Sequence, residues 1–426
     1  MPVHGPLFDE LFSEILRIPV VDVHNHLNPE ALAPRSIDDI VFYHYIVTEL
    51  ASSGMPWEEL EGSRGVERLQ RALRYIRRIR NTSTYWCLMG SLRDLYGFEG
   101  SYIDEKSWRL VAELVEKAVG DEARALRILR ERVPVKKSIL TIQPLEPLPK
   151  YDPQLFTGAL RMDSLVPGMT PDSLRRLEEV TGVEVRDPDG LAEALQHLVK
   201  KFEGHVVAIT FSIQPDDDFY GLAAPHSSVA PYIEALRRGR WIGVTGRRLL
   251  NSFAFEELVR IAGEKGLVVQ MMLGVKRPLP GASPPDYALV VYRPEQVVNL
   301  GLLLARHPET RFDIIIADPL LNHQVSVIAK NYPNSYLSGY WWFSMYPEYI
   351  STYLRTRLQM LPYTKIHGFF SDAYVADWVY GKALLAKREL AHTLAVLVEK
   401  GYLDKGLALE IAEALLHRNA EELYRL

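Results

Sequence analysis

Eight short apolar runs, separated by segments with helical spacing, are the feature that most constrains the fold of this chain. Each run is rich in β-branched and other apolar residues, as expected for a strand that is buried on both faces. The runs lie at residues 20–27, 137–143, 156–165, 206–212, 267–275, 312–318, 335–342 and 365–372. Strands that alternate with helices pair in parallel, and eight of them can close into a ring. The pattern therefore predicts an α/β fold, a (β/α)8 TIM barrel.

The connection between the first two runs is much longer than a crossover between neighbouring strands requires. It covers about 110 residues and shows helical patterns at 36–50, 66–80 and 107–132. We expect a helical insertion at about 36–134 that lies over the C-terminal ends of the strands. A second long loop, at 278–286, follows the fifth strand, and loops on this face often act as lids.

Helical patterns also fill other connections of the predicted barrel. They occupy 171–179, 253–265 and 294–306, and the chain is helical after the eighth strand. With its insertion and C-terminal helices, the sequence fits one TIM-barrel domain at 1–426.

Composition excludes some classes of function. The net charge is −5, with 47% apolar and 24% charged residues, so nothing favours nucleic acid or an anionic membrane as partner. Cys87 is the single cysteine, which rules out an intramolecular disulfide. The N-terminal segment lacks the pattern of a signal peptide, and no apolar run is long enough to span a membrane. We expect a cytoplasmic enzyme that acts on a small molecule and forms a homo-oligomer.

Two histidines one residue apart close the first run. On a strand, residues i and i+2 point to the same side, so His24 and His26 project together from its C-terminal end. Imidazoles at this spacing can share one metal ion. The alternative is that the two histidines are unrelated residues of a half-buried strand.

Asp372 closes the eighth run. When the ring closes, the last strand lies beside the first, which brings this carboxylate next to the paired histidines. It can then complete a His-His-Asp metal site or act as a base beside the metal. The alternative is a helix N-cap, because a helical segment follows Ser371 and Asp372.

Other polar or aromatic residues also occur at or near the ends of the predicted strands. They are Gln143, Arg161, Asp163, Ser212, Gln270, Lys276, Arg277, Asp318, Asn322, His323, Trp341 and Trp342. Arg161 suits either an ion pair with Asp163 or a fork for a substrate carboxylate. Trp341 and Trp342 are consecutive, so one is expected to face the barrel interior and the other the helix layer.

Several motifs, in this order, resemble those of the uronate isomerases of the amidohydrolase superfamily. They are residues 22–27 (DVHNHL), 43–45 (YHY) with 53–54 (SG), 81–97, 159–163 (ALRMD), 271–276 (MMLGVK), 339–343 (GYWWF) and 371–373 (SDA). The resemblance covers nearly the whole chain. It implies interconversion of a hexuronate aldose and its ketose, for example glucuronate and fructuronate.

The resemblance also implies roles for individual residues. His24, His26 and Asp372 match the metal ligands, whereas Tyr45 and His44 match active-site residues on the insertion. Arg161 matches an arginine at the end of the third strand, and Trp341 or Trp342 matches an aromatic wall. Hydrolases of the superfamily usually add histidines after the fifth and sixth strands. The fifth strand has none here, and His323 is the candidate after the sixth.

One position departs from the family pattern. Uronate isomerases usually read Asp-x-Arg after the eighth strand, and this chain has Tyr374 in place of the arginine. A phenol cannot form a bidentate ionic pair with a carboxylate, so another cation must hold the substrate anion. Arg161 is one candidate. Lys276 and Arg277 are others, although a solvated loop is the favoured interpretation for Arg277.

The leading prediction is an aldose–ketose isomerase of a hexuronate or related sugar acid that works through an enediol and binds one divalent ion, expected to be zinc. Asp372 would be the base, Tyr45 a proton donor and Arg161 the residue that orients the substrate. His44, Trp341, Trp342 and Tyr374 would line the substrate site. The alternatives are a metal-dependent hydrolase or decarboxylase, favoured if His323 takes part, and a sugar-acid-binding protein without activity.

Overall fold

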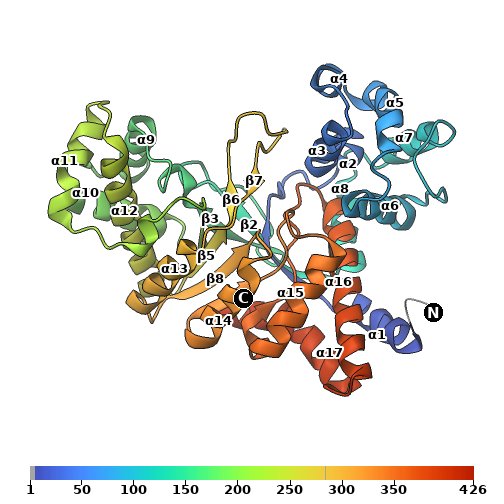
Figure 1. Ribbon diagram of the computed structural model, residues 1–426. Helices are drawn as coiled ribbons and strands as arrows, with labels where there is room; N and C mark the ends of the chain where they lie inside the picture. Colours follow the sequence, from blue (N-terminus) through green and yellow to red (C-terminus); the bar gives the residue numbers. More distant parts are fainter. Residues whose placement is uncertain (1–4, 284) are drawn as a thin grey trace.

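The computed structural model, which describes residues 5–283 and 285–426, confirms the predicted α/β barrel (Figure 1). Eight strands pair in parallel in the order β1-β2-β3-β4-β5-β8-β9-β10. They are β1 Val20–Asn25, β2 Val135–Ile142, β3 Phe156–Arg161, β4 Val206–Ile213, β5 Val268–Leu273, β8 Arg311–Ile316, β9 Ser335–Ser338 and β10 Ile366–His367. The last two strands are shorter than predicted, because the chain leaves regular pairing after Ser338 and His367.

The ring closes through an irregular seam between β1 and the segment that follows β10. The backbone N–H of Asp372 donates to the carbonyl oxygen of His24 at 3.0 Å, and the N–H of His26 donates to the carbonyl oxygen of Ala373 at 2.9 Å. The buried Asp22 carboxylate accepts from the Ser371 N–H at 2.7 Å and the Ser371 hydroxyl at 2.6 Å. These contacts place Asp372 directly beside the paired histidines.

The barrel contains a buried polar network around Asp313. Tyr424, from the C-terminal helix α18 (Asn419–Tyr424), reaches into the barrel and donates to the carboxylate of Asp313 on β8 at 2.5 Å. Gln270 on β5 donates to the Tyr424 hydroxyl and to the carbonyl oxygen of Val23, both at 2.8 Å. Gln270 was expected near the wall of the site, and it belongs instead to the barrel core, because it lies in the middle of its strand.

The long connection after β1 is helical, and its helices form the lobe at the upper right of Figure 1. They are α2 Asp38–Val41, α3 His44–Ser52, α4 Trp57–Glu61, α5 Gly65–Ile76, α6 Ser83–Tyr96, α7 Trp108–Glu116 and α8 Glu122–Arg127, followed by the π-helix η1 Ile128–Arg132. α5 buries Leu69, Leu73 and Ile76, which recur at helical spacing, and leaves its charged face in solvent.

A second helical lobe lies on the other side of the barrel mouth, at the upper left of Figure 1. It contains α9 Pro171–Thr181, α10 Pro188–Lys201, α11 His226–Arg237 and α12 Gly243–Lys265, with the 3-10 turns η2 Met162–Ser164 and η3 Phe219–Gly221. Between the lobes stands an antiparallel hairpin of β6 (Val275–Lys276) and β7 (Leu289–Val290). Residues 278–283 and 285–286 of the predicted loop form the tip of this hairpin, and residue 284 lies outside the described residues.

The remaining helices surround the lower part of the barrel (Figure 1). They are α1 Pro6–Arg17, α13 Glu295–Arg306, α14 Leu321–Asn331, α15 Pro347–Met360, α16 Ala376–Glu399 and α17 Lys405–Glu413, with η4 Tyr363–Lys365 and η5 Ala414–Arg418. Within residues 5–283 and 285–426, no helix combines the length and the apolar character that crossing a membrane requires.

Lys387 on α16 should make the stability of the protein depend on pH. Its ammonium group is buried and donates to the carbonyl oxygens of Leu16 at 3.0 Å and Ile18 at 2.7 Å, which ties α16 to the end of α1. Burial lowers the pKa of Lys387 to about 8. A lysine in an unfolded chain titrates near about 10.4. Between these values the unfolded chain binds more protons, so the free energy of unfolding rises with pH.

We expect Lys387→Met to remove this rise, which amounts to about 2 to 3 kcal/mol between pH 8 and pH 10. Urea unfolding of both proteins at the two pH values measures it. Parallel pH profiles for the natural protein and the variant would contradict the assignment.

Candidate active site and metal centre

A cavity of about 390 Å³ opens at the C-terminal ends of the strands, beneath the insertion and the β6–β7 hairpin. Its wall comes from three parts of the chain. The insertion contributes Arg35, Asp38, Asp39, Phe42, Tyr43 and His44, and the hairpin contributes Arg277, Pro285 and Asp286. The strand ends contribute His24, His26, Arg161, Met272, Trp341, Trp342, Asp372, Tyr374 and Val375. This volume suits a small molecule of the size of a sugar acid.

The structure brings His24, His26 and Asp372 together at the inner end of the cavity. One ligand atom from each lies within 4.8 Å of the others. The Nε2 atoms of His24 and His26 are 3.8 Å and 3.3 Å from Asp372 Oδ1. Three donors this close, from two imidazoles and a carboxylate, can converge on one divalent ion.

His24 provides an independent test of whether these residues fit a metal. Its side chain is buried, and neither ring nitrogen has a hydrogen-bond partner. Burial, with a smaller contribution from His26, lowers the pKa of His24 to about 3. The ring is therefore neutral at ordinary pH and offers a lone pair. A buried imidazole without partners is costly, and coordination of an ion removes that cost.

The backbone of Asp372 adopts a conformation that is uncommon for a residue other than glycine, with φ of 50°. Its carbonyl oxygen accepts hydrogen bonds from the Tyr43 hydroxyl at 2.7 Å and from Lys382 Nζ at 3.3 Å. The alternative role as a helix cap is wrong, because α16 begins at Ala376 and its N-cap residue is Val375. Strained residues are often found at functional sites, where surrounding contacts hold them.

The Asp372 carboxylate is held in its ionised form. Burial by itself raises its pKa, but the hydrogen bond from His26 and the positive charge of Lys382 outweigh this effect, and the pKa lies well below its usual range. The Tyr45 hydroxyl donates to Oδ2 of Asp372. Tyr45 was expected to give a proton to the substrate, yet it is absent from the cavity wall and stacks on Trp342 at 4.5 Å. The Tyr45 hydroxyl therefore binds the Asp372 carboxylate and does not line the cavity.

His44 and Tyr374 form an aromatic rim beside the cluster of His24, His26 and Asp372. The His44 ring contacts Tyr45 and Tyr374, with ring centroids 3.9 Å and 5.1 Å away. Burial lowers the pKa of His44 to about 3, so this ring is also neutral. Tyr374 stacks on His26, with centroids 5.0 Å apart. Tyr374, which replaces the arginine of the family pattern, therefore lies within the site.

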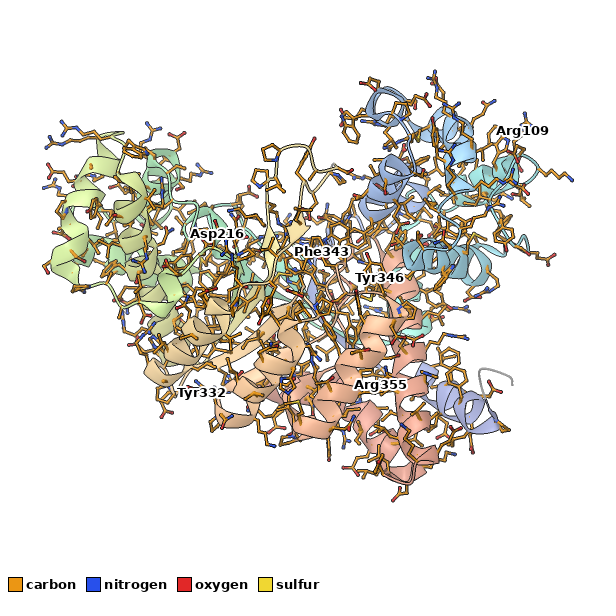
Figure 2. All side chains as sticks on the ribbon, viewed as in Figure 1. Arg109, Asp216, Tyr332, Phe343, Tyr346 and Arg355 are labelled. Carbon is orange, nitrogen blue, oxygen red and sulfur yellow. The ribbon has the colours of Figure 1, made fainter. Side chains whose placement is uncertain are left out.

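The expectation that Trp341 and Trp342 face opposite layers is wrong. β9 ends at Ser338, so both residues lie in a loop without strand alternation, and both line the cavity. Phe343 and Tyr346 follow in the same loop, and Figure 2 shows them between the hairpin and the insertion helices.

Three arginines line the cavity, namely the largely exposed Arg35 and the more buried Arg161 and Arg277. Arg161 donates from Nε to Asp163 at 2.8 Å and from Nη2 to Ser212 at 3.3 Å, which fixes its side chain at the wall. The expectation of a solvated Arg277 is wrong, because its guanidinium pairs with Asp286 and lies 5.4 Å from the Trp341 ring.

Several other predicted wall residues lie outside the cavity. Lys276 pairs with Asp216 at 2.7 Å, at the base of the hairpin in Figure 2. Asp318 accepts from the N–H of Leu320 at the start of α14. Asn322 accepts from Arg357 Nε at 3.0 Å. His323 is exposed on α14, so the feature that would favour a hydrolase is absent from the cavity wall.

Two features of the site lie outside the pattern of strand ends, namely Lys382 and the pairing of Arg277 with Asp286. Lys382 belongs to α16, where it follows Trp378 by four residues and so shares its buried face. A lysine on the apolar face of a helix is a signal that sequence periodicity could have provided. The pairing of Arg277 with Asp286 depends on the hairpin, which a loop prediction does not contain.

Comparison with known proteins gives a consistent result. No model of a protein family matches the chain. The uronate isomerase of Cutibacterium acnes is 22% identical over 454 residues, covering 98% of this chain and 95% of that protein. The crystal structure of the uronate isomerase of Thermotoga maritima superposes with a TM-score of 0.89 at 18% identity, covering 99% and 98% of the two chains. The glucuronate isomerase of Caulobacter crescentus gives a TM-score of 0.87 at 17% identity, covering 100% and 96%.

These similarities extend over nearly the full length of the proteins compared. The structural matches show that the fold is shared, insertion included, and the sequence matches agree with the order of motifs along the chain. The low identity is that of a distant relative. The chain is thus similar, over nearly its whole length and at low identity, to the uronate isomerases, a family of the amidohydrolase superfamily.

Proposed function

We propose that this protein is a metal-dependent aldose–ketose isomerase of a hexuronate or a related sugar acid, of the glucuronate-to-fructuronate type. The observation that carries the proposal is the cluster of His24, His26 and Asp372 at the inner end of a cavity that also exposes the guanidinium groups of Arg161 and Arg277. A site for an ion and a site for an anion thus share one small cavity. The names of the relatives support the same activity.

The reaction moves a proton between two adjacent carbons through an enediol. It needs a group that accepts the proton and a positive group that stabilises the developing enediolate oxygen. A divalent ion at the His24–His26–Asp372 cluster would supply that positive charge. We propose Zn²⁺, which suits two imidazoles and a carboxylate.

We propose Asp372 as the residue that also carries the proton. Four carboxylates line the cavity, and Asp372 is the most deeply buried, with a side-chain exposure of 6% against 18% to 22% for Asp38, Asp39 and Asp286. Its ionised form can accept a proton. Tyr45 positions this carboxylate through its hydroxyl group, rather than acting on the substrate itself.

Arg161 and Arg277 would hold the substrate carboxylate in the same cavity as the metal ligands. Guanidinium groups match a carboxylate with two parallel hydrogen bonds. His44, Tyr374 and the two tryptophans would then contact the apolar faces of the sugar chain. We also propose that the protein is a cytoplasmic enzyme of a small molecule and that it forms a homo-oligomer.

Proton exchange at C2 in D2O tests the proposed activity. The purified protein should contain about one divalent ion per chain, and NMR should show deuterium at C2 of glucuronate or galacturonate. An aldonate has a carboxylate in place of the aldehyde at C1, so its C2 proton should not exchange. His24→Ala should abolish both metal binding and exchange. Failure of every uronate to exchange in metal-loaded protein would overturn the assigned reaction.

Tyr374→Arg tests whether the departure from the family pattern limits activity on uronates. The tyrosine hydroxyl lies close enough to Arg161, Arg277 and Asp286 for their charges to influence its pKa. A guanidinium at this position could pair with Asp286 or bind the substrate carboxylate. We expect Tyr374→Arg to raise kcat/KM for glucuronate or galacturonate about tenfold.

Tyr374→Phe is the control for this change, because it keeps the ring stacked on His26 and removes only the hydroxyl. If uronates are inert with both the natural protein and Tyr374→Arg, uronate isomerisation is wrong for this protein.

A further inference from the structure

A lysine from outside the cavity lies directly behind the metal ligands. Lys382 projects from α16 and is 2% exposed. Its ammonium group donates to the carbonyl oxygen of Ser371 at 2.5 Å, to the hydroxyl of Tyr43 at 3.0 Å and to the carbonyl oxygen of Asp372 at 3.3 Å. An ammonium group has three donors, and each has an acceptor here.

These acceptors belong to the groups that orient Asp372. The carbonyl oxygens of Ser371 and Asp372 belong to the two peptide groups on either side of the Cα of Asp372, the residue with positive φ. Tyr43 donates to the same Asp372 carbonyl oxygen. The Lys382 ammonium also lies 5.0 Å and 4.5 Å from the ring centroids of Tyr43 and Tyr45. Tyr45 in turn donates to the carboxylate. One cation therefore contacts the backbone of Asp372 and both tyrosines that bind it.

Burial of a cation carries a desolvation penalty. An apolar side chain would fill the same space without that penalty, so packing alone does not explain a lysine here. Lys387 on the same helix shows what a purely structural lysine does, since it binds the carbonyl oxygens at the end of α1. Lys382 differs because its acceptors belong to the seam that carries a metal ligand. Groups behind metal ligands fix ligand geometry, and their loss typically lowers metal affinity or activity about 10- to 100-fold.

We propose that Lys382 is a positioning residue of the metal centre, which holds Asp372 in its strained backbone conformation so that the carboxylate faces His24 and His26. The inference rests on the metal centre of the proposed function and is independent of the sugar that the enzyme uses.

Lys382→Met tests it, because methionine fills similar space and removes the charge and the three donors. Zn²⁺ alone is the probe, titrated against a chromophoric chelator. We expect at least about a tenfold loss of Zn²⁺ affinity and, in Zn²⁺-saturated protein, a lower kcat with KM changed less than about threefold. Co²⁺ substitution should show an altered visible absorption band.

Lys387→Met is the matched control, since it removes a buried ammonium from the same helix away from the cavity. It should change the pH dependence of stability while retaining Zn²⁺ affinity and the Co²⁺ spectrum. Tyr43→Phe removes one of the two donors to the Asp372 carbonyl oxygen and gives a second test if Lys382→Met does not fold. It should weaken Zn²⁺ binding in the same direction.

Three outcomes are distinguishable. Natural protein that binds no Zn²⁺ overturns the metal centre itself. Natural affinity in folded Lys382→Met, or in Tyr43→Phe when Lys382→Met does not fold, overturns the role of Lys382. Equal losses of Zn²⁺ affinity in Lys382→Met and Lys387→Met would make both lysines structural and would also overturn it.

Discussion

Asp372→Asn should lower the rate of C2 proton exchange at least about a hundredfold while leaving the fold intact. The amide has nearly the shape of the carboxylate, but it cannot accept the proton and binds a divalent ion weakly. In the natural protein the Tyr45 hydroxyl donates to Oδ2 of the Asp372 carboxylate. An amide nitrogen at this position would be a donor in place of an acceptor, so this hydrogen bond would be lost. Exchange in D2O, measured at saturating metal, separates loss of chemistry from loss of the ion.

Asp187→Asn is a suitable control for this substitution. Asp187 caps α10 by accepting from the N–H of Gly190, and asparagine caps a helix equally well. Its exchange rate should equal that of the natural protein. Near-normal turnover in well-folded Asp372→Asn would refute the catalytic role of Asp372.

Arg161→Gln is expected to raise KM for the uronate about 10- to 100-fold with a smaller effect on kcat. Hydrogen bonds to a charged group contribute about 1.5–3 kcal/mol, and glutamine provides neither the charge nor the fork. Asp163 retains the Ser212 N–H at 2.8 Å as a partner, so the wall of the cavity should persist. Steady-state kinetics on glucuronate measures the effect.

Lys276→Gln is the control, since it removes a cation near the mouth whose partner, Asp216, lies outside the cavity. It should leave KM unchanged. A fall in kcat without a change in KM for Arg161→Gln would show that Arg161 acts in the transition state and does not hold the substrate carboxylate.

The barrel was predictable because it depends on local composition and on chain order. The runs at 20–27 and 312–318 are apolar and β-branched, and such segments leave few alternatives to a buried strand. Closure of the ring then implied that Asp372 lies beside His24 and His26. These inferences needed only the period of a strand and the topology of the fold.

The cavity wall was less predictable because it is built from irregular backbone. Alternation along a strand placed Trp341 and Trp342 on opposite sides, and this failed because β9 ends before them. Arg277 was assigned to solvent because its pairing with Asp286 is created by a hairpin. Lys382 acts from a helix outside the barrel, so no inspection of strand ends could include it.

The seam of the ring has a consequence for how the chain folds. Asp22 and Ser371, which bind each other across it, are 349 positions apart. Contacts between such distant positions are slow to form, because the entropy of closing the loop must be overcome first. His24 and His26 lie on one side of the seam and Asp372 on the other. The three ligands therefore come together only when the barrel has closed. An ion that binds this set favours the joined state by mass action. The same ion would thus stabilise the closed barrel. Its concentration would then determine the fraction of newly synthesised chains that are folded.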